Sequence, residues 1–243
     1  MNGNTHSDPV GASTLEIISK ASRLNKWMYD TIRPFIKGEV LEVGSGIGNI
    51  SQYLVRAGYS ITLSDYNPEY RRKLEPVMAP YKNVREIISI DLQEDQYELK
   101  YQQYREKFDT VFLLNVIEHI NDDMKAVEIC RFLLKPGGHL IVLAPAFQTL
   151  FSRLDTELGH FRRYTVKSLS AVIEKNYLTV IHKRYLNLLG ISGWLVSGKI
   201  LHHRSLQRGE MNLFNRLVPL ARLMDKLVFN RIGLSAVVVA KKD

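Results

Sequence analysis

The sequence Glu39-Val-Leu-Glu-Val-Gly-Ser-Gly-Ile-Gly48 is the strongest indication of a fold in this chain. It reads as a short apolar strand that carries Glu42 near its end and runs directly into three glycines at alternate positions. Glycine lacks a Cβ atom, so such a turn can bend sharply and let a ligand approach the main chain. A helix is predicted to begin near residues 49–50, and its first N–H groups would point into the turn. The stretch therefore predicts a nucleotide-sized binding site after the first strand.

Two classes of cofactor use a glycine turn of this kind. The dinucleotide fingerprint G-x-G-x-x-G places a pyrophosphate at the helix N-terminus. Gly44 and Gly46 fit that pattern, but Asn49 stands where its third glycine belongs, and the third glycine here is Gly48. The carboxylate of Glu42 would repel a pyrophosphate and attract a cation. The local charge therefore favours S-adenosylmethionine, which carries an ammonium group, a sulfonium group and no phosphate.

Each of the next three predicted strands also ends at a polar side chain. These side chains are Asp65, Asp91 and Asn115, at the ends of strands predicted for residues 60–65, 84–90 and 108–114. Asp65 lies about 20 residues beyond the glycine turn, where a carboxylate can accept both ribose hydroxyl groups. The carboxyl ends of parallel strands form the ligand crevice of an open sheet, so these groups are expected to line one site.

The order of the predicted elements indicates the fold class. Helices alternate with strands over most of the chain, and three further strands are predicted at residues 139–144, 178–185 and 233–240. This alternation predicts an α/β fold with a doubly wound, mostly parallel sheet and helices on both faces. The length of 243 residues suits one such domain. A single cysteine, Cys130, excludes a disulfide framework and is expected to be a buried thiol.

We expect the chain to form one domain after a short tail. In order, the segments are a flexible tail (1–12), an N-terminal covering helix (13–37), a cofactor-binding half (38–145), a substrate-side half (146–232) and a terminal strand (233–243). Ser13 and Glu16 have the spacing of a capping box at the start of the covering helix. Asn25, Trp27 or Tyr29 of that helix could cover the cofactor, or Trp27 and Met28 could simply belong to the core.

An ordered set of motifs resembles the Rossmann-like, class I S-adenosylmethionine-dependent methyltransferases, and most of all the small-molecule, quinone-biosynthesis-type branch. The motifs are Leu41-Glu-Val-Gly-Ser-Gly-Ile-Gly48, Leu63-Ser-Asp65, Ile90-Asp91, Asn115-Val-Ile-Glu-His119 and Leu134-Lys-Pro-Gly-Gly-His-Leu-Ile-Val-Leu143. The resemblance covers roughly residues 39–145. It implies a seven-stranded sheet whose last strand is antiparallel and inserted before the sixth, with a helical lid between the final two strands.

The resemblance also implies roles for the residues of these motifs. The methionine end of S-adenosylmethionine would be held by Glu42 and by the loop of Gly44, Ser45, Gly46 and Gly48. The remaining cofactor-binding residues would be Asp65 and Tyr66 at the ribose, Asp91 and Leu92 at the adenine, and Asn115 and Val116 beside the sulfonium. Pro145, at the end of the fifth strand, matches the point where the family begins its substrate side.

Charge is distributed unevenly along the chain. Residues 1–150 contain 17 Lys or Arg and 19 Asp or Glu, a net charge of −2, whereas residues 151–232 contain 14 and 5, a net charge of +9. Such a basic half attracts phosphate, carboxylate, nucleic acid or an anionic membrane surface, and a solvated basic face is the alternative. We therefore predict a small-molecule or lipid-like acidic acceptor, with peripheral contact to an anionic membrane as a further possibility.

A loop at residues 150–165 brings proton carriers and cations together. They are His160, Arg162, Arg163 and Tyr164. The two arginines are predicted to bind the acidic substrate, because a guanidinium group is a planar donor for phosphate or carboxylate. Alternatively, one of them pairs with Asp155 or Glu157 and fixes the loop.

The predicted chemistry is in-line transfer of the sulfonium methyl group to an oxygen, nitrogen or carbon nucleophile. Because the cofactor supplies the leaving group, the protein mainly aligns the reactants and excludes water. A base is needed only if the nucleophile starts protonated. His160 and His119 are the candidates, with Tyr164 as a further proton carrier, although Glu118-His119 resembles a family motif that shapes the pocket.

The segment at residues 185–201 is apolar and carries no charge before Lys199. It is too short and too rich in Gly, Ser and Asn for a membrane span. We predict a substrate lid that includes Trp194, while a dimer face or plain core is the alternative. His202 and His203 lack accompanying ligands at metal spacing, so no metal is predicted. Cations follow the segment and continue along a helix predicted for residues 213–229.

These features lead to a predicted function of methyl transfer. Two alternatives remain open: an RNA methyltransferase, which the basic half permits, and a non-catalytic S-adenosylmethionine-binding interaction protein. No Asn-Pro-Pro-Tyr-type tetrapeptide follows residues 108–114, which disfavours RNA, and a dehydrogenase is the least favoured class. The sequence has no uninterrupted apolar run of 18 residues and no signal-peptide pattern, so a cytoplasmic location is expected.

Overall fold

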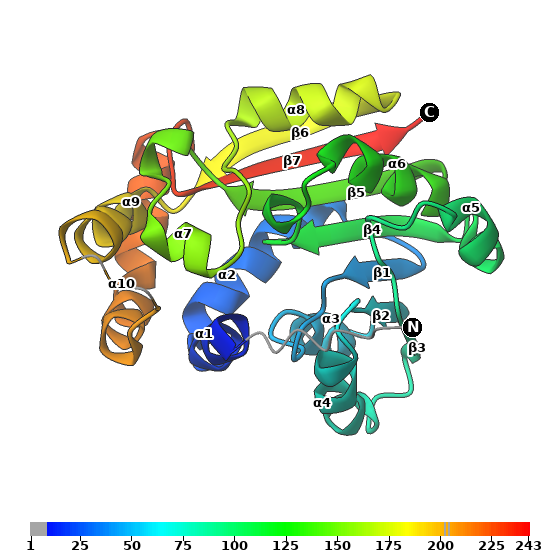
Figure 1. The fold of residues 1–243 in the computed structure, drawn as a ribbon, viewed down its shortest axis with the longest axis horizontal. Helices are drawn as coiled ribbons and strands as arrows, with labels where there is room; N and C mark the ends of the chain where they lie inside the picture. The colour runs from blue at the N-terminus through cyan, green and yellow to red at the C-terminus, as the bar shows by residue number, and fades with distance from the viewer. Residues whose placement is uncertain (1–8, 202, 204) are drawn as a thin grey trace.

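A seven-stranded sheet forms the centre of the computed structural model, which describes residues 9–201, 203 and 205–243 (Figure 1). The strand order is β3-β2-β1-β4-β5-β7-β6. The strands are β1 (Val40–Val43), β2 (Ile61–Ser64), β3 (Val84–Ile88), β4 (Phe108–Leu114), β5 (Leu134–Pro145), β6 (Leu178–Leu186) and β7 (Ser235–Lys242). The pairings among β1 to β5 are parallel, whereas β7 runs antiparallel to both β5 and β6. The predicted fold class, with its inserted antiparallel strand, is confirmed.

Helices cover both faces of the sheet. They are α1 (Pro9–Ser19), α2 (Ser22–Ile32), α3 (Ser51–Arg56), α4 (Pro68–Met78), α5 (Tyr97–Lys100), α6 (Asp123–Leu133), α7 (Arg153–Glu157), α8 (Val166–Lys175), α9 (Leu188–Trp194) and α10 (Arg208–Leu227), with a π-helical segment at Leu195–Ile200. The described helices thus include helical structure between β6 and β7, where a lid was predicted. Its role as a lid stays a prediction.

Local sequence signals fix the starts of several helices. The side chain of Asn67 accepts the N–H of Glu69 at 2.9 Å, and Pro68 occupies the first helical position of α4. The side chain of Asp122 accepts the N–H of Lys125 at 3.0 Å at the start of α6. Both caps satisfy an N–H group that a helix start otherwise leaves unpaired.

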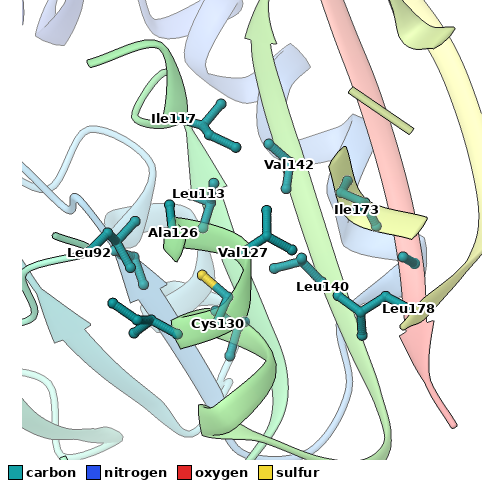
Figure 2. Packing of buried hydrophobic residues seen from close by; sticks show 14 of the residues in the cluster. Leu92, Leu113, Ile117, Ala126, Val127, Cys130, Leu140, Val142, Ile173 and Leu178 are labelled. Carbon is teal, nitrogen blue, oxygen red and sulfur yellow. The ribbon is translucent and has the colours of Figure 1, made fainter. Parts of the chain in front are cut away.

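Successive residues of the central strands point to opposite faces and build two separate cores. On one face, helices α6 and α8 pack on β4, β5 and β7 (Figure 2). Figure 2 shows Val127 of α6 beside Leu140 and Val142 of β5, and Cys130 of α6 and Ile173 of α8 belong to the same buried cluster. The thiol of Cys130 is buried, as predicted, and burial raises its pKa to about 12.

The opposite face is covered by α2, α3, α4 and α10. Phe112 and Ile141 of the central strands are fully buried there against Leu54 and Ala221 from the helices. Truncating such a fully buried leucine to alanine costs roughly 2–5 kcal/mol, because a cavity remains where the side chain was. The two cores together hold the carboxyl ends of the parallel strands in fixed relative positions, which is the frame for the site.

The N-terminal region differs from its prediction. Residues 9–12, which were expected to belong to the tail, form the start of α1. The predicted covering helix is interrupted at residues 20–21, so that two helices, α1 and α2, replace it. Ser13 therefore lies inside a helix, so the predicted capping box is wrong. Trp27 and Met28 are both buried in the second core, which matches the core interpretation. Tyr29 is buried beside them, and the side chain of Asn25 donates to the carbonyl of Ile18 at 2.8 Å. The predicted tail at residues 1–8 lies outside the described part of the chain.

Candidate functional site

The glycine turn follows β1 directly and has the strained backbone that its sequence predicts. Gly44, Gly46 and Gly48 have φ angles of 75°, 55° and 87°, in the left-handed region that favours glycine. A Cβ atom on Gly44 would lie 2.4 Å from a methyl group of Val116, so this position also requires glycine for space. Val116 therefore packs against the turn, and its role beside the sulfonium stays a prediction.

Helix α1 lies over the same turn. A Cβ atom on Gly46 would come within 3.2 Å of the side chain of Leu15, and the amide of Asn49 donates to the carbonyl of Leu15 at 3.0 Å. The covering element at the turn is thus α1, whereas the residues predicted for that role lie on α2.

Two buried carboxylates flank the turn. Glu42 is 4% exposed and its carboxylate accepts a short hydrogen bond from the hydroxyl of Ser51 at the start of α3. Asp65, 5% exposed, accepts the N–H groups of Gly46 and Asn67, both at 2.9 Å. Burial raises the pKa of Glu42 to about 7 and also raises the pKa of Asp65. A cation placed in the turn would favour the charged form of both carboxylates.

The other predicted cofactor residues lie at the ends of the neighbouring strands. Asn115 is exposed with a φ of 55° and donates its N–H to the carbonyl of Leu143 at 2.8 Å. Asp91 follows β3 and its carboxylate accepts the N–H of Gln93 at 2.9 Å. Leu92 is buried in the first core, whereas Tyr66 is 68% exposed after β2. Their roles at the ribose, the adenine and the sulfonium stay predictions.

A second group of side chains is built around Asp155 in α7. Asp155 is fully buried, and its carboxylate accepts Nε and Nη2 of Arg163 at 2.7 and 3.1 Å. The Nδ1 atom of His160 lies 2.9 Å from Oδ1 of the same carboxylate. Burial alone would raise the pKa of Asp155, but the hydrogen bonds from His160 and Arg163 keep this pKa below its ordinary value. Since an ionised carboxylate only accepts hydrogen bonds, Nδ1 carries the proton and Nε2 is left as the basic atom.

The placement of Arg163 matches the alternative interpretation of the loop. Its side chain is 1% exposed, its guanidinium group pairs with Asp155, and its Nη1 donates to the carbonyl of Ala146 at 3.2 Å. The indole ring of Trp194 covers it with the Cζ atom 4.3 Å from the ring centre, and the indole N–H donates to Leu150. Arg163 therefore fixes the loop through Asp155 and Ala146, as the alternative interpretation expected, and its role in substrate binding stays a prediction.

Arg162 and Tyr164 both bind Asp123 at the start of α6. The guanidinium group of Arg162 lies 3.0 Å from the carboxylate and also donates to the carbonyl of Asn121 at 2.6 Å. The Tyr164 hydroxyl is buried and donates to the same carboxylate at 2.8 Å. Burial raises the pKa of Tyr164 far above its ordinary value, with Asp123 adding to the shift. The phenol is thus a structural donor here, while Arg162 keeps a half-exposed side chain.

Glu118, in the helical turn after β4, completes the cluster. It is fully buried, and within the described residues neither of its carboxylate oxygens has a hydrogen-bond partner. Burial raises its pKa to about 7. The rings of His119 and His160 meet edge to face with centres 4.7 Å apart. Ligand-capable atoms of Glu118, His119 and His160 all lie within 4.8 Å of one another, so this cluster can hold a proton or a cation.

The prediction that no metal is bound concerns His202 and His203. His203 lies 3.2 Å from a carboxylate oxygen of Glu210, and His202 is outside the described residues. The cluster of Glu118, His119 and His160 has no recognisable ligand spacing in the sequence, because 41 residues separate His119 from His160.

The comparison of the whole sequence with known families adds to this geometry. A profile described as "Methyltransferase domain" matches residues 19–183, which is more than half of the chain. The chain belongs to this methyltransferase family. The match covers α2, the glycine turn, the carboxyl ends of β1 to β5, the Asp155 cluster and most of β6.

Individual members of the methyltransferase family share only modest sequence identity with this chain. A ubiquinone biosynthesis O-methyltransferase of Xanthomonas euvesicatoria pv. vesicatoria (strain 85-10) is 27% identical over 161 residues, covering 58% of this chain and 65% of that protein. Another with the same description, from Actinobacillus pleuropneumoniae serotype 5b (strain L20), is 33% identical over 107 residues, covering 42% and 43%. The matched part thus leaves a substantial share of each relative uncovered.

A solved structure supports the fold. The phosphoethanolamine N-methyltransferase 2 of Haemonchus contortus, in complex with phosphomonomethylethanolamine and S-adenosylhomocysteine, superimposes with a TM-score of 0.63 at 15% identity. The superposition covers 99% of this chain and 59% of that one. At this identity the likeness concerns the fold alone.

Replacing Glu118 with a neutral residue should increase the free energy of unfolding of this chain, and the increase should depend on pH. The folded pKa of Glu118, about 7, exceeds the ordinary 4.5, so the folded state keeps a proton that the unfolded state loses. Stability therefore falls as the pH rises from about 4.5 to 7. We expect Glu118→Gln to increase the free energy of unfolding at pH 8 by on the order of 2–3 kcal/mol, and much less at pH 5.

Urea denaturation at the two pH values measures this difference. The exposed Glu174 provides the matched control. Glu174→Gln is expected to cause a similarly small change in the free energy of unfolding at pH 5 and at pH 8. An equal gain from Glu118→Gln at pH 5 and pH 8 would contradict a buried carboxyl that titrates near neutrality.

Proposed function

We propose that this chain is an S-adenosylmethionine-dependent methyltransferase that methylates a hydroxyl oxygen of a small-molecule or lipid-like acidic acceptor. The observation that carries the proposal is the glycine turn with buried Glu42 on one side and Asp65 on the other. Two carboxylates at a turn suit a cationic methyl donor and disfavour a pyrophosphate. The descriptions of the two relatives as O-methyltransferases support oxygen as the acceptor atom.

The backbone of the turn also suits a ligand that approaches the main chain. Gly44 and Gly46 have positive φ angles, and without Cβ atoms they pack closely against Val116 and Leu15. Glu42 would face the ammonium group, and Asp65 lies at the end of the adjacent strand, where it would accept the ribose hydroxyls. When bound, the donor supplies an activated methyl group on a good leaving group. The chain must then align the acceptor and take its proton.

His160 is the base that we propose for that proton. Asp155 holds Nδ1 of the imidazole, and Arg163 in turn fixes Asp155, so the ring presents Nε2 in one orientation. The acceptor oxygen gains the methyl group and loses its proton to Nε2. The neighbouring carboxyl of Glu118 could relay that proton because its pKa is about 7. Arg162, half-exposed beside this cluster, is the cation that we propose for the acidic part of the acceptor.

The binding part of the proposal predicts a specific loss. Asp65→Ala removes the acceptor of two backbone N–H groups and the proposed partner of the ribose. We expect S-adenosylmethionine binding to weaken by more than about 1 kcal/mol in calorimetry. Asp65→Asn keeps one acceptor oxygen, so its affinity for S-adenosylmethionine should lie between those of the unaltered chain and Asp65→Ala. Asp95→Ala removes an exposed carboxylate on another loop and is expected to leave affinity unchanged. Unchanged affinity in Asp65→Ala would contradict the assignment.

Transfer of labelled methyl from S-adenosylmethionine into a cell extract tests the activity itself. Label in a small organic-soluble product supports the proposal. Label in RNA supports the alternative of an RNA methyltransferase, and tight binding without any transfer supports a non-catalytic binding protein. Preference for NAD over S-adenosylmethionine in calorimetry would overturn the cofactor class.

A further inference from the structure

Helix α10 carries a row of exposed leucines that the proposed chemistry does not use. Leu213, Leu217, Leu220, Leu223 and Leu227 are between 37% and 69% exposed. Their spacings of four, three, three and four residues place them along one side of a helix. The opposite side is buried through Val218, Ala221 and Asp225, so the leucine row faces away from the protein.

Cations accompany this leucine row. Of the acidic residues of α10, Asp225 is buried, whereas Glu210, with a side chain that is 39% exposed, lies in the first turn and pairs with His203. Arg216 is exposed between the leucines, and Lys226 is exposed near the end of the helix. Glu210 accepts the hydroxyl of Ser197 at 2.8 Å. Asp225 is buried and accepts the N–H groups at the start of α9. Over residues 213–227 the exposed surface of α10 is therefore apolar and positively charged.

A cationic hollow lies beside the row. It has a volume of about 480 Å³, and its lining residues are Arg23, Lys26, Val218, Pro219, Arg222, Leu223 and Lys226. Arg222 and Lys26 share the carboxylate of Asp30, which leaves the hollow with an excess of positive charge. Leu223 belongs both to the leucine row and to the hollow, so apolar chains and an anionic group could be bound side by side.

We propose that α10 is an interfacial helix that rests on an anionic phospholipid bilayer, with its leucines among the acyl chains and the hollow over a lipid phosphate. An apolar stripe bordered by Lys and Arg has the charge and polarity of such helices. A second copy fits less well, because a two-fold contact would bring Arg216 and Lys226 close to the same cations of the partner. RNA offers phosphate but no partner for five leucines.

The arrangement of the fold gives this surface a use. Helix α10 packs against α1, α2 and α9, and α1 covers the glycine turn. Figure 1 shows α1, α7, α9 and α10 together at the end of the sheet toward which the arrow of β4 points. Docking of α10 would therefore bring the site close to the bilayer, where a lipid-like acceptor resides. None of the described helices is long and apolar enough to cross a membrane, so the contact proposed is peripheral.

Sedimentation of the full chain with vesicles tests the inference without cofactor or acceptor, so its outcome is independent of the proposed activity. Phosphatidylcholine vesicles that contain phosphatidylglycerol are expected to retain the chain, and pure phosphatidylcholine vesicles are not. Leu217→Ser with Leu220→Ser should lower the partition coefficient by at least about tenfold. Arg216→Gln and Lys226→Gln should each lower it about fivefold, and added salt should mimic them.

The control is Leu99→Ser in α5, which removes an equally apolar side chain with 79% exposure on another part of the surface. It is expected to bind vesicles like the unaltered chain. Three results would overturn the inference: binding that the leucine substitutions leave unchanged, a dimer in sedimentation velocity that these substitutions dissociate without any vesicle binding, or RNA binding that outcompetes the vesicles and depends on the same cations.

Discussion

His160→Gln is expected to lower the rate of methyl transfer by about 10²- to 10⁴-fold, the usual contribution of a positioned general base. Glutamine keeps a polar group of similar size near Asp155 but cannot take a proton. Because His160 lies on the loop of the Asp155 cluster and not in the glycine turn, S-adenosylmethionine affinity in calorimetry should change little. The loss should therefore appear in kcat.

The rate is measured with labelled S-adenosylmethionine and the acceptor fraction identified from cell extract. His182→Gln serves as the control, since His182 lies on β6 against Phe35 and outside the Asp155 cluster. Asp155→Asn tests the positioning role separately, because it should shift the pH profile of kcat rather than remove the base. A rate within a few-fold of the unaltered chain in His160→Gln would show that the acceptor needs no base or uses another.

Arg163→Ala should destabilise the folded chain by about 3–5 kcal/mol, the effect of leaving one member of a buried ion pair without its partner. Asp155 is fully buried and would keep only His160 and Ser152 as donors. The pKa of Asp155 is held below its ordinary value in the unaltered chain, so this pair contributes stability above that value and loses it as the pH falls. The deficit should thus shrink toward acidic pH.

Urea denaturation at pH 7 and at acidic pH measures this deficit. The matched control is Arg162→Ala, which removes a half-exposed arginine at the next position and should cost no more than about 1 kcal/mol. A comparable loss in both variants would indicate that the two arginines share the structural role. A loss below about 1 kcal/mol in Arg163→Ala would show that the Asp155 pair adds little to stability.

Much of the cofactor half could be predicted because its signals are local. A glycine turn, a strand that ends in a carboxylate and a helix start all lie within a few residues of one another, and parallel strands bring their ends together by geometry. The N-terminal prediction failed for a related reason. Apolar spacing continues through residues 13–35, but the break at 20–21 is set by how two helices pack, which spacing does not encode.

The sequence predicts most of the residues of the Asp155 cluster but not how their side chains are arranged. His160, Arg162 and Arg163 were recognised as a group, yet neighbouring residues of an extended segment point in opposite directions. Which arginine is buried therefore depends on where Asp155 and Asp123 lie in the fold. Glu118 could not be joined to His160 from the sequence, because their contact is tertiary. Its position two residues after the wall residue Val116 was the only local hint.

The place of β7 between β5 and β6 also governs the order in which the sheet can be assembled during synthesis. The first five strands can pair with one another as soon as each leaves the ribosome. Strand β6, made earlier than β7, has β7 as its neighbour in the sheet and must wait for residues 235–242. Until then the edge of β6 and the facing edge of β5 both remain unpaired, so a nascent chain carries two open strand edges that can pair with other chains and aggregate.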